Sequence, residues 1–328
     1  MKPSVILTAL AVPVLAGLGG WQPGSAEQPG RFSLVQRTLD REVAVDFTAP
    51  AGGIWRVDTT SDLQGWEGWV SFTSAGVTRH LDSAAAYHPQ RFYRAIEVAS
   101  ATPLTGDHFA TQTGDAVIHP VNHASFVIGW DHRVLYVDPV GGAERYRDLP
   151  RADLILLTHE HGDHLHTGTI ESVRGPDVAI VASQAAFNGL SPGLKTSAQV
   201  LTNGARATLL GLTVEAVPAY NLTTSNHPKG NGNGYVLTLG GKRLYISGDT
   251  EDTPELRALR DIDIAFVAMN VPYTMAVAKA ASAVREFRPK VVYPYHYRNA
   301  DGTFADLETF KWQVGTDLGI EVRLRKWY

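Results

Sequence analysis

The sequence predicts an α/β fold in which sheets are packed between helices, preceded by a small all-β module. From residue 104 onward, continuous apolar strands alternate with amphipathic helices, which is typical of sheets covered on both faces. Before that point, short segments alternate between apolar and polar residues and are separated by Gly and Pro, as in antiparallel sheets. We therefore predict two folded parts, at residues 27–103 and 104–328.

Composition limits the classes of function. A chain of 328 residues, 44% of them hydrophobic, is long enough for two domains with sizeable cores. Its 33 acidic and 29 basic residues nearly balance, so nothing indicates a general attraction to nucleic acid. The chain has no cysteine, which excludes disulfides and thiolate–metal bonds. Any metal ligand must therefore be nitrogen or oxygen.

Residues 1–26 have the layout of a secretory signal peptide. Lys2 precedes an apolar run from Val5 to Leu18, and small residues lead to a cleavage site after Ala26. Pro13 and several glycines make this run a poor membrane span, and no second span follows. We expect a secreted or periplasmic protein without an integral membrane segment once the peptide is removed.

Residues 27–103 predict a small β-sandwich-like accessory domain. Strands are expected at residues 32–35, 43–47, 54–57 and 69–72. We interpret the module as a stabilising or spacing domain whose aromatic residues form its core. A carbohydrate- or surface-binding role is the alternative.

The second part is predicted to open with three strands and to continue as strands and helices. The expected strands are residues 116–119, 125–130, 134–137, 154–157, 178–182, 207–210, 212–216, 234–239, 243–247, 290–293 and 321–324. The expected helices are residues 184–190, a helix beginning near Thr253, residues 275–287 before Pro289, and residues 305–319.

A cluster of histidine and aspartate follows the apolar strand at residues 154–157. In an extended or turning backbone, His159 and His161 point the same way, and Asp163 and His164 turn toward a neighbouring point. This arrangement supplies two imidazoles for one metal ion and a carboxylate with an imidazole for a second, about 3.5–4 Å away. A solvent-facing polar loop is the alternative, but four such ligands in six positions are rare by accident.

The same four residues match the HxHxDH signature, so the chain resembles the metallo-β-lactamase superfamily. The resemblance implies an αββα metallo-β-lactamase sandwich at residues 104–328. The segments at residues 122–125 and 135–139 are similar to the opening of its L-ascorbate-6-phosphate lactonase-like branch. In that branch the position of Asp138 supports the metal loop, where a carboxylate could accept the second N–H of a ligand histidine.

The resemblance also implies metal ligands at two later strand ends. Asp249, in a Gly-Asp-Thr sequence, matches the aspartate that bridges two ions, whereas a helix cap is the alternative. His296 matches the last ligand. The superfamily places one more histidine between the two motifs, but Asn221 stands there. Either Asn221 ligates through its amide oxygen, or His227 swings in from its loop, or water fills the position.

The predicted site therefore holds one or two divalent ions, Zn or Mn. Its predicted metal ligands are His159, His161, Asp163, His164, Asp249, His296 and Asn221. Its predicted catalytic residues are Asp163, His123 and Tyr297, and its predicted substrate contacts are Tyr220, His227, Lys229 and Tyr273. We interpret His119 and His166 as structural.

The implied activity is metal-dependent hydrolysis of an ester or lactone bond in a phosphorylated or anionic small molecule. Lys229 is the expected contact for the anionic group. A phosphodiesterase or phospholipase-type hydrolase is one alternative, and a metal-stabilised binding module without turnover is another. The sequence does not indicate an oligomeric state.

Overall fold

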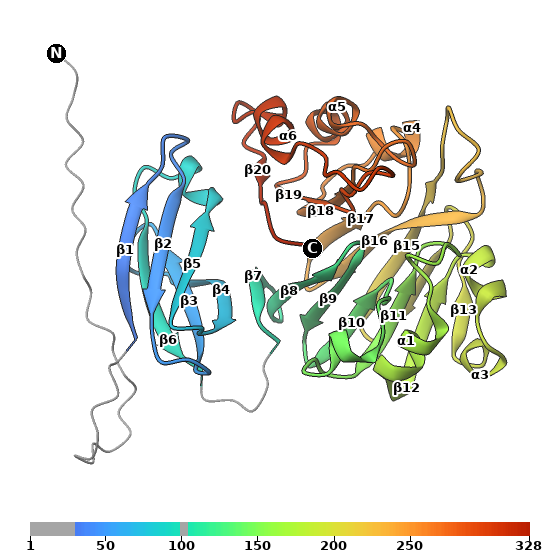
Figure 1. Cartoon of the computed structure of the whole chain (residues 1–328), viewed down its shortest axis with the longest axis horizontal. Helices are drawn as coiled ribbons and strands as arrows, with labels where there is room; N and C mark the ends of the chain where they lie inside the picture. Colours follow the sequence, from blue (N-terminus) through green and yellow to red (C-terminus); the bar gives the residue numbers. More distant parts are fainter. Residues whose placement is uncertain (1–29, 99–103) are drawn as a thin grey trace. The chain divides into compact units, whose positions relative to one another are not determined.

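Figure 1 shows the computed structural model, which describes residues 30–98 and 104–328. The predicted signal peptide lies outside the described residues. The chain divides into two compact units between Phe109 and Ala110, a few residues after the boundary predicted from the sequence. Within the described ranges, no helix combines the length and apolar character that crossing a bilayer requires.

The first unit is an antiparallel all-β module, as predicted. One sheet contains β1 (Arg31–Arg37), β2 (Val43–Thr48) and β5 (Val77–Asp82), and the other contains β3 (Ile54–Thr60), β4 (Glu67–Thr73) and β6 (Phe92–Glu97). Apolar side chains of both sheets form one core. At its centre, the ring of Phe47 lies 4.9 Å from that of Trp55 and 5.9 Å from that of Phe72. Its aromatic residues thus pack internally, which favours the structural interpretation.

The first sheet of the second unit has the strand order β13-β12-β11-β10-β9-β8. Its strands are β8 (Gly114–Asn122), β9 (Ser125–Trp130), β10 (Arg133–Val137), β11 (Ala152–Leu157), β12 (Arg174–Ala182) and β13 (Ala198–Val200). The strands from β10 to β13 run parallel. Strand β11 lies inside this parallel group and is almost wholly buried, which explains its continuous apolar sequence.

The second sheet has the order β14-β15-β16-β17-β18-β19-β20. Its strands are β14 (Arg206–Leu209), β15 (Leu212–Ala219), β16 (Gly232–Leu239), β17 (Lys242–Ile246), β18 (Ile264–Ala268), β19 (Val291–Tyr295) and β20 (Glu321–Val322). Pairing is antiparallel from β14 to β17 and parallel from β17 to β20. The parallel strands place their carboxyl ends at one edge of this sheet.

The two sheets pack face to face between helices. The ring of Phe126 in β9 stacks on that of Phe266 in β18 at 4.2 Å, and the Tyr235 hydroxyl of β16 donates to the Leu157 carbonyl of β11 at 2.8 Å. The helices are α1 (Thr167–Val173), α2 (Gln184–Gly189), α3 (Pro192–Lys195), α4 (Pro254–Arg257), α5 (Val277–Phe287) and α6 (Leu307–Val314). Figure 1 shows α1–α3 beside the first sheet and α4–α6 beside the second. The predicted αββα sandwich is confirmed.

The end of helix α6 differs from the prediction, and one alternative for Asp249 is excluded. Helix α6 ends at Val314 rather than near residue 319, because Gly315 follows with a φ of 68°, where a helix stops. Short α4 is capped by the Thr253 hydroxyl, which accepts from the Leu256 N–H at 3.3 Å. Asp249 is therefore not the cap of this helix.

Candidate metal centre

The candidate ligands lie at the carboxyl ends of strands in both sheets. The cluster from His159 to His164 follows β11, Asp249 follows β17, and His296 follows β19. Strands β17 and β19 run parallel within the second sheet and end at one edge of it, and the packing of the two sheets brings the end of β11 beside them, with His164 Nε2 3.3 Å from Asp249 Oδ1. At the end of β17 the backbone adopts a conformation that favours glycine. Gly248 has a φ of 57°, and a Cβ there would lie 2.8 Å from the Asn233 carbonyl oxygen, so this glycine lets Asp249 be placed.

The first ligand group consists of His159, His161 and His227. Their ligating atoms lie within 4.8 Å of one another, and His159 Nε2 is 3.2 Å from His161 Nδ1. His227 comes from the loop between β15 and β16. Burial lowers the pKa of His159 well below its ordinary value and also lowers the pKa of His227. Both imidazoles are thereby favoured in the neutral form that binds metal.

Asn221 holds His227 instead of facing the other two histidines. Its Oδ1 accepts a hydrogen bond from His227 Nδ1 at 2.5 Å, which leaves His227 Nε2 to point into the cluster. Its amide N–H groups donate to Glu251 Oε1 at 3.1 Å and to the Tyr273 carbonyl at 2.8 Å. The expectation that Asn221 ligates the metal is thus not supported by this geometry, because its oxygen is engaged by the loop histidine. We assign the third position to His227.

The second ligand group is built around Asp249. Its Oδ1 lies 3.3 Å from His164 Nε2 and 3.4 Å from His296 Nε2, whereas its Oδ2 lies 3.4 Å from His227 Nε2. The two carboxylate oxygens therefore face different histidine sets, as the bridging position requires. His164 Nε2 and His296 Nε2 are themselves 3.0 Å apart.

Asp138 supports this group from behind, as expected. It accepts hydrogen bonds from the Thr158 N–H at 2.8 Å and hydroxyl at 2.6 Å, and it lies 2.8 Å from His164 Nδ1. The bond from Nδ1 fixes the tautomer that presents Nε2 to Asp249. Burial lowers the pKa of His164, whereas the carboxylates of Asp249 and Asp138 raise it, and the net shift is upward. The negative charges of Asp249 and Asp138 would attract a cation to this group.

His123 joins the cluster through Asp163. Its Nε2 lies 3.0 Å from Asp163 Oδ2, its Nδ1 lies 2.8 Å from the Tyr328 hydroxyl, and its ring centroid is 3.8 Å from that of His296. Burial raises the pKa of Asp163, but hydrogen bonds from His123 and His296 lower it, and the net shift is downward.

These bonds have a defined direction. The ionised carboxylate of Asp163 only accepts, so His123 Nε2 carries the hydrogen and Nδ1 accepts from the Tyr328 hydroxyl. That hydroxyl in turn accepts from the Arg298 backbone N–H at 3.2 Å. Sequence reasoning missed Tyr328, because an isolated tyrosine far from every motif carries no signal of this role.

Three other predicted site residues are occupied elsewhere. The Tyr220 hydroxyl donates to Glu255 Oε2 at 2.9 Å, and Lys229 Nζ lies 2.6 Å from Glu255 Oε1. The Lys229 charge is therefore paired with Glu255, and its contact with an anionic substrate stays a prediction. The Tyr297 hydroxyl, which was predicted to be catalytic, donates to the Arg325 carbonyl at 3.4 Å.

Two further residues keep the roles expected for them. The Tyr273 ring is 40% exposed and remains a candidate substrate contact, while its carbonyl anchors Asn221. His166 caps helix α1, where its Nδ1 accepts from the Thr169 N–H at 3.1 Å. It is therefore structural.

The donor set fits a divalent cation. Among the described residues, His227 Nε2 and Asp249 Oδ1 are buried polar atoms without a hydrogen-bond partner. Such atoms are rare in folded proteins unless a ligand, ion or water satisfies them. Imidazole nitrogen and carboxylate oxygen are ligands for zinc and for harder ions such as manganese. His159, His161, Asp163, His164, His227, Asp249 and His296 would hold the metal.

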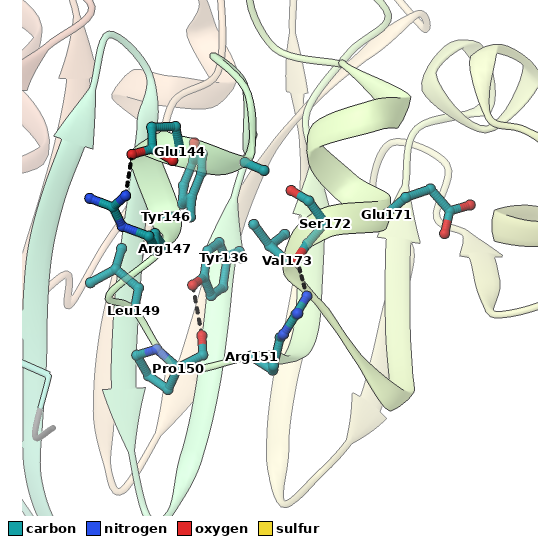
Figure 2. Close-up of a pocket in the computed structure, with 11 residues that line it drawn as sticks. Tyr136, Glu144, Tyr146, Arg147, Leu149, Pro150, Arg151, Glu171, Ser172 and Val173 are labelled. Carbon is teal, nitrogen blue, oxygen red and sulfur yellow. Dashed lines mark hydrogen bonds and ion pairs between the residues drawn. The ribbon is translucent and has the colours of Figure 1, made fainter. Parts of the chain in front are cut away.

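A cavity of about 400 Å³ lies at the other end of β11. Figure 2 shows it between β11, η2 (Ala143–Tyr146) and the end of α1. Arg151 donates to the Ser172 carbonyl, and Arg147 pairs with Glu144. The six residues of β11 separate this cavity from the histidines by about 20 Å. These arginines are already satisfied, so the cavity offers neither of them to a ligand.

Comparison with known proteins places this centre in a family. Residues 118–296 match the β-lactamase superfamily domain. The chain is 32% identical over 209 residues to a UPF0173 metal-dependent hydrolase of Pyrococcus abyssi, covering 60% of this chain and 90% of that protein. A relative of the same description from Thermococcus onnurineus is 33% identical over 208 residues, with the same coverage.

Solved structures agree. A structure named as a metal-dependent hydrolase from Parabacteroides distasonis is 42% identical, with a TM-score of 0.60, and covers 67% of this chain and 97% of its own. The metallo hydrolase Igni18 of Ignicoccus hospitalis shares the fold. It is 23% identical, with a TM-score of 0.55, and the match covers 64% of this chain and 94% of its own. This chain belongs to the β-lactamase superfamily and is a metal-dependent hydrolase with the metallo-β-lactamase fold.

Proposed function

We propose that this hydrolase cleaves an ester or lactone bond in a small molecule, using two divalent ions, Zn or Mn. The observation that carries the proposal is the uneven exposure of the ligand cluster. The Asp163 side chain is 48% exposed, whereas those of His164, His296, Asp249 and His227 are at most 5% exposed. The centre is therefore open on the side of Asp163 and His161, where a substrate can approach.

Each residue near the open side has a role in this proposal. When bound, the ions activate water and polarise the scissile bond. Asp163 orients the attacking water, because it is the exposed carboxylate of the cluster. His123 donates from Nε2 to Asp163 and holds that carboxylate in place, and Tyr328 keeps His123 in the required tautomer. Asn221 likewise fixes the tautomer of His227, by accepting a hydrogen bond from its Nδ1.

The bond type rests on resemblance. The segments at residues 122–125 and 135–139 are similar to the opening of the L-ascorbate-6-phosphate lactonase-like branch, which favours an ester or lactone. Phosphodiester hydrolysis is the second candidate, because a carboxylate that faces two ligand sets suits in-line displacement at phosphorus. Secretion of the mature enzyme is part of the proposal, on the layout of residues 1–26.

A panel of chromogenic substrates tests this function. Protein reconstituted with Zn or Mn is assayed on an aryl ester, a lactone and a phosphodiester, with bound metal measured in parallel. We expect the ester or lactone to be cleaved fastest, and Asp163→Asn to lower the rate by roughly a hundredfold or more. Asp317→Asn, at a surface ion pair with Arg285, is the matched control and should leave the rate unchanged. A fully metallated protein that cleaves none of the three would favour a binding module without turnover.

A further inference from the structure

Four large apolar side chains are exposed on loops beside the metal centre. Leu222 is 54% exposed, Val271 41%, Tyr273 40% and Phe304 53%. They follow β15, β18 and β19, whose carboxyl ends lie at the same edge of the second sheet as the carboxyl end of β17. We call these four residues the apolar rim. In the described part of the second unit, the only other large apolar side chain with such exposure is Trp312 on α6.

Hydrogen bonds join the three loops of the rim. The Asn221 amide donates to the Tyr273 carbonyl at 2.8 Å, which connects the first loop to the second. The Val271 N–H donates to Asn299 Oδ1 at 3.1 Å, and the Ala300 N–H donates to the Val271 carbonyl at 3.1 Å, which connects the second loop to the third. Single exposed apolar residues are normal on a protein surface, but these bonds hold the loops of four such residues together near the candidate ligands, which favours a binding surface.

Arg298 supplies a positive charge at one end of the rim. It is exposed and lies two residues after the candidate ligand His296. Its guanidinium lies 4.3 Å from the ring centroid of Tyr328 and 5.8 Å from that of Phe304. Its backbone N–H donates to the same Tyr328 hydroxyl that contacts His123. The residue is therefore held close to the metal centre.

The charge of Arg298 is available to a ligand. Among the described residues, no carboxylate forms an ion pair with it, whereas Lys229 is paired with Glu255 at 2.6 Å. A guanidinium stacked on an aromatic ring keeps its N–H edges for a carboxylate or a phosphate. Arg298 is therefore a second candidate for the anion contact that the sequence placed at Lys229.

We propose that the substrate of this centre is amphiphilic, with an apolar group on the rim and a carboxylate or phosphate on Arg298. This rests on the proposed function, because it treats the centre as the place where bond cleavage occurs. Each methylene that leaves water on the rim should tighten binding by about fourfold at most. A charge-assisted hydrogen bond to Arg298 should contribute roughly tenfold or more.

Calorimetry on the metal-loaded full chain tests recognition without turnover. The ligands are octyl phosphate, ethyl phosphate and octanoate. We expect octyl phosphate to bind at least about tenfold more tightly than ethyl phosphate. Phe304→Ser should reduce that ratio, and Trp312→Ser, which removes an exposed aromatic residue outside the rim, should not.

Arg298→Gln tests the charge. It should weaken octyl phosphate or octanoate by roughly tenfold or more, and the more strongly affected ligand identifies the anion. Arg260→Gln is the control, because Arg260 is also exposed but donates to backbone carbonyls of its own segment. Equal binding of octyl and ethyl phosphate by the native protein, or unchanged binding of both octyl phosphate and octanoate by Arg298→Gln, would overturn the proposal. If these results hold but no model substrate is cleaved, the proposed reaction fails while the recognition stands.

Discussion

Removing His227 should weaken one metal position and leave the other intact. His227→Ala leaves the first group with His159 and His161, which share their ion with Asp249. Residues that only orient a ligand typically contribute tenfold to hundredfold in metal affinity, so losing a ligand itself should cost more than about a hundredfold. Asn221→Ala removes the acceptor of His227 Nδ1, and we expect a loss of about tenfold to hundredfold.

The assay is a titration of metal-free protein with Zn or Mn against a chelator of known affinity, with bound metal measured at each point. In both variants the step assigned to His159, His161 and His227 should shift, while the step assigned to Asp163, His164 and His296 should not. Asn221→His, which restores the residue typical of the superfamily, should not tighten the first position because His227 already fills it. His166→Ala is the control, since that histidine caps α1. Two unchanged steps in His227→Ala would refute the assignment of the loop histidine.

Three further results follow from the same structure. Removing the metal should lower the thermal midpoint of unfolding by roughly 5–10 °C, because binding at a metal concentration of about 100 Kd contributes ~2.7 kcal/mol of stability. Scanning calorimetry with and without a chelator measures this difference, and equal midpoints would contradict a metal site. Tyr328→Phe should shift the tautomer of His123 away from Nε2–H and lower hydrolysis about tenfold, and unchanged ¹⁵N imidazole signals would contradict the positioning role. Residues 104–328 alone should fold and hydrolyse as the mature chain does, because every candidate ligand follows that boundary; a soluble, fully metallated but inactive fragment would argue against it.

The general position of the centre could be predicted from the sequence because two local signals coincide. An apolar strand is recognisable from composition, and β11 and β17 each run into residues that bind metal. Asp249 and His296 could be placed with the HxHxDH cluster without a structure because they match the later ligand positions that the superfamily resemblance implies.

The third ligand of the first group could not be predicted in the same way. His227 lies on a loop between β15 and β16, and loop conformation has no periodicity that a sequence reveals. Asn221 stood at the expected strand end and was therefore the better candidate by position. The structure brings both residues together, and the hydrogen bond of 2.5 Å between them decides which one orients the other.

The ion pair of Lys229 could not be predicted for a related reason. Lys229 was the candidate anion contact because of its charge and its closeness in sequence to the site. Its partner Glu255 lies on α4, and an ion pair between distant segments cannot be read from sequence neighbours. Arg298 carried a weaker signal, although it stands two residues after His296. Its availability depends on what it does not contact, which only the folded chain shows.

The loop that carries the candidate ligand His227 also carries Leu222 of the apolar rim. Glu251 anchors that loop, because its Oε2 accepts from the Leu222 N–H at 2.9 Å and from the Thr223 N–H at 3.0 Å. The same segment carries His227 at one end and the exposed Leu222 at the other. Displacement of His227 from a metal would therefore strain the hydrogen bonds that position Leu222. A ligand bound on the rim would in turn affect the conformation of the loop that carries His227. A ligand that holds this loop in its metal-binding conformation should bind more tightly when the metal is present, and by linkage the metal should then bind more tightly by the same factor. Octyl phosphate should accordingly tighten metal binding at the position of His159, His161 and His227. This tightening should disappear in His227→Ala.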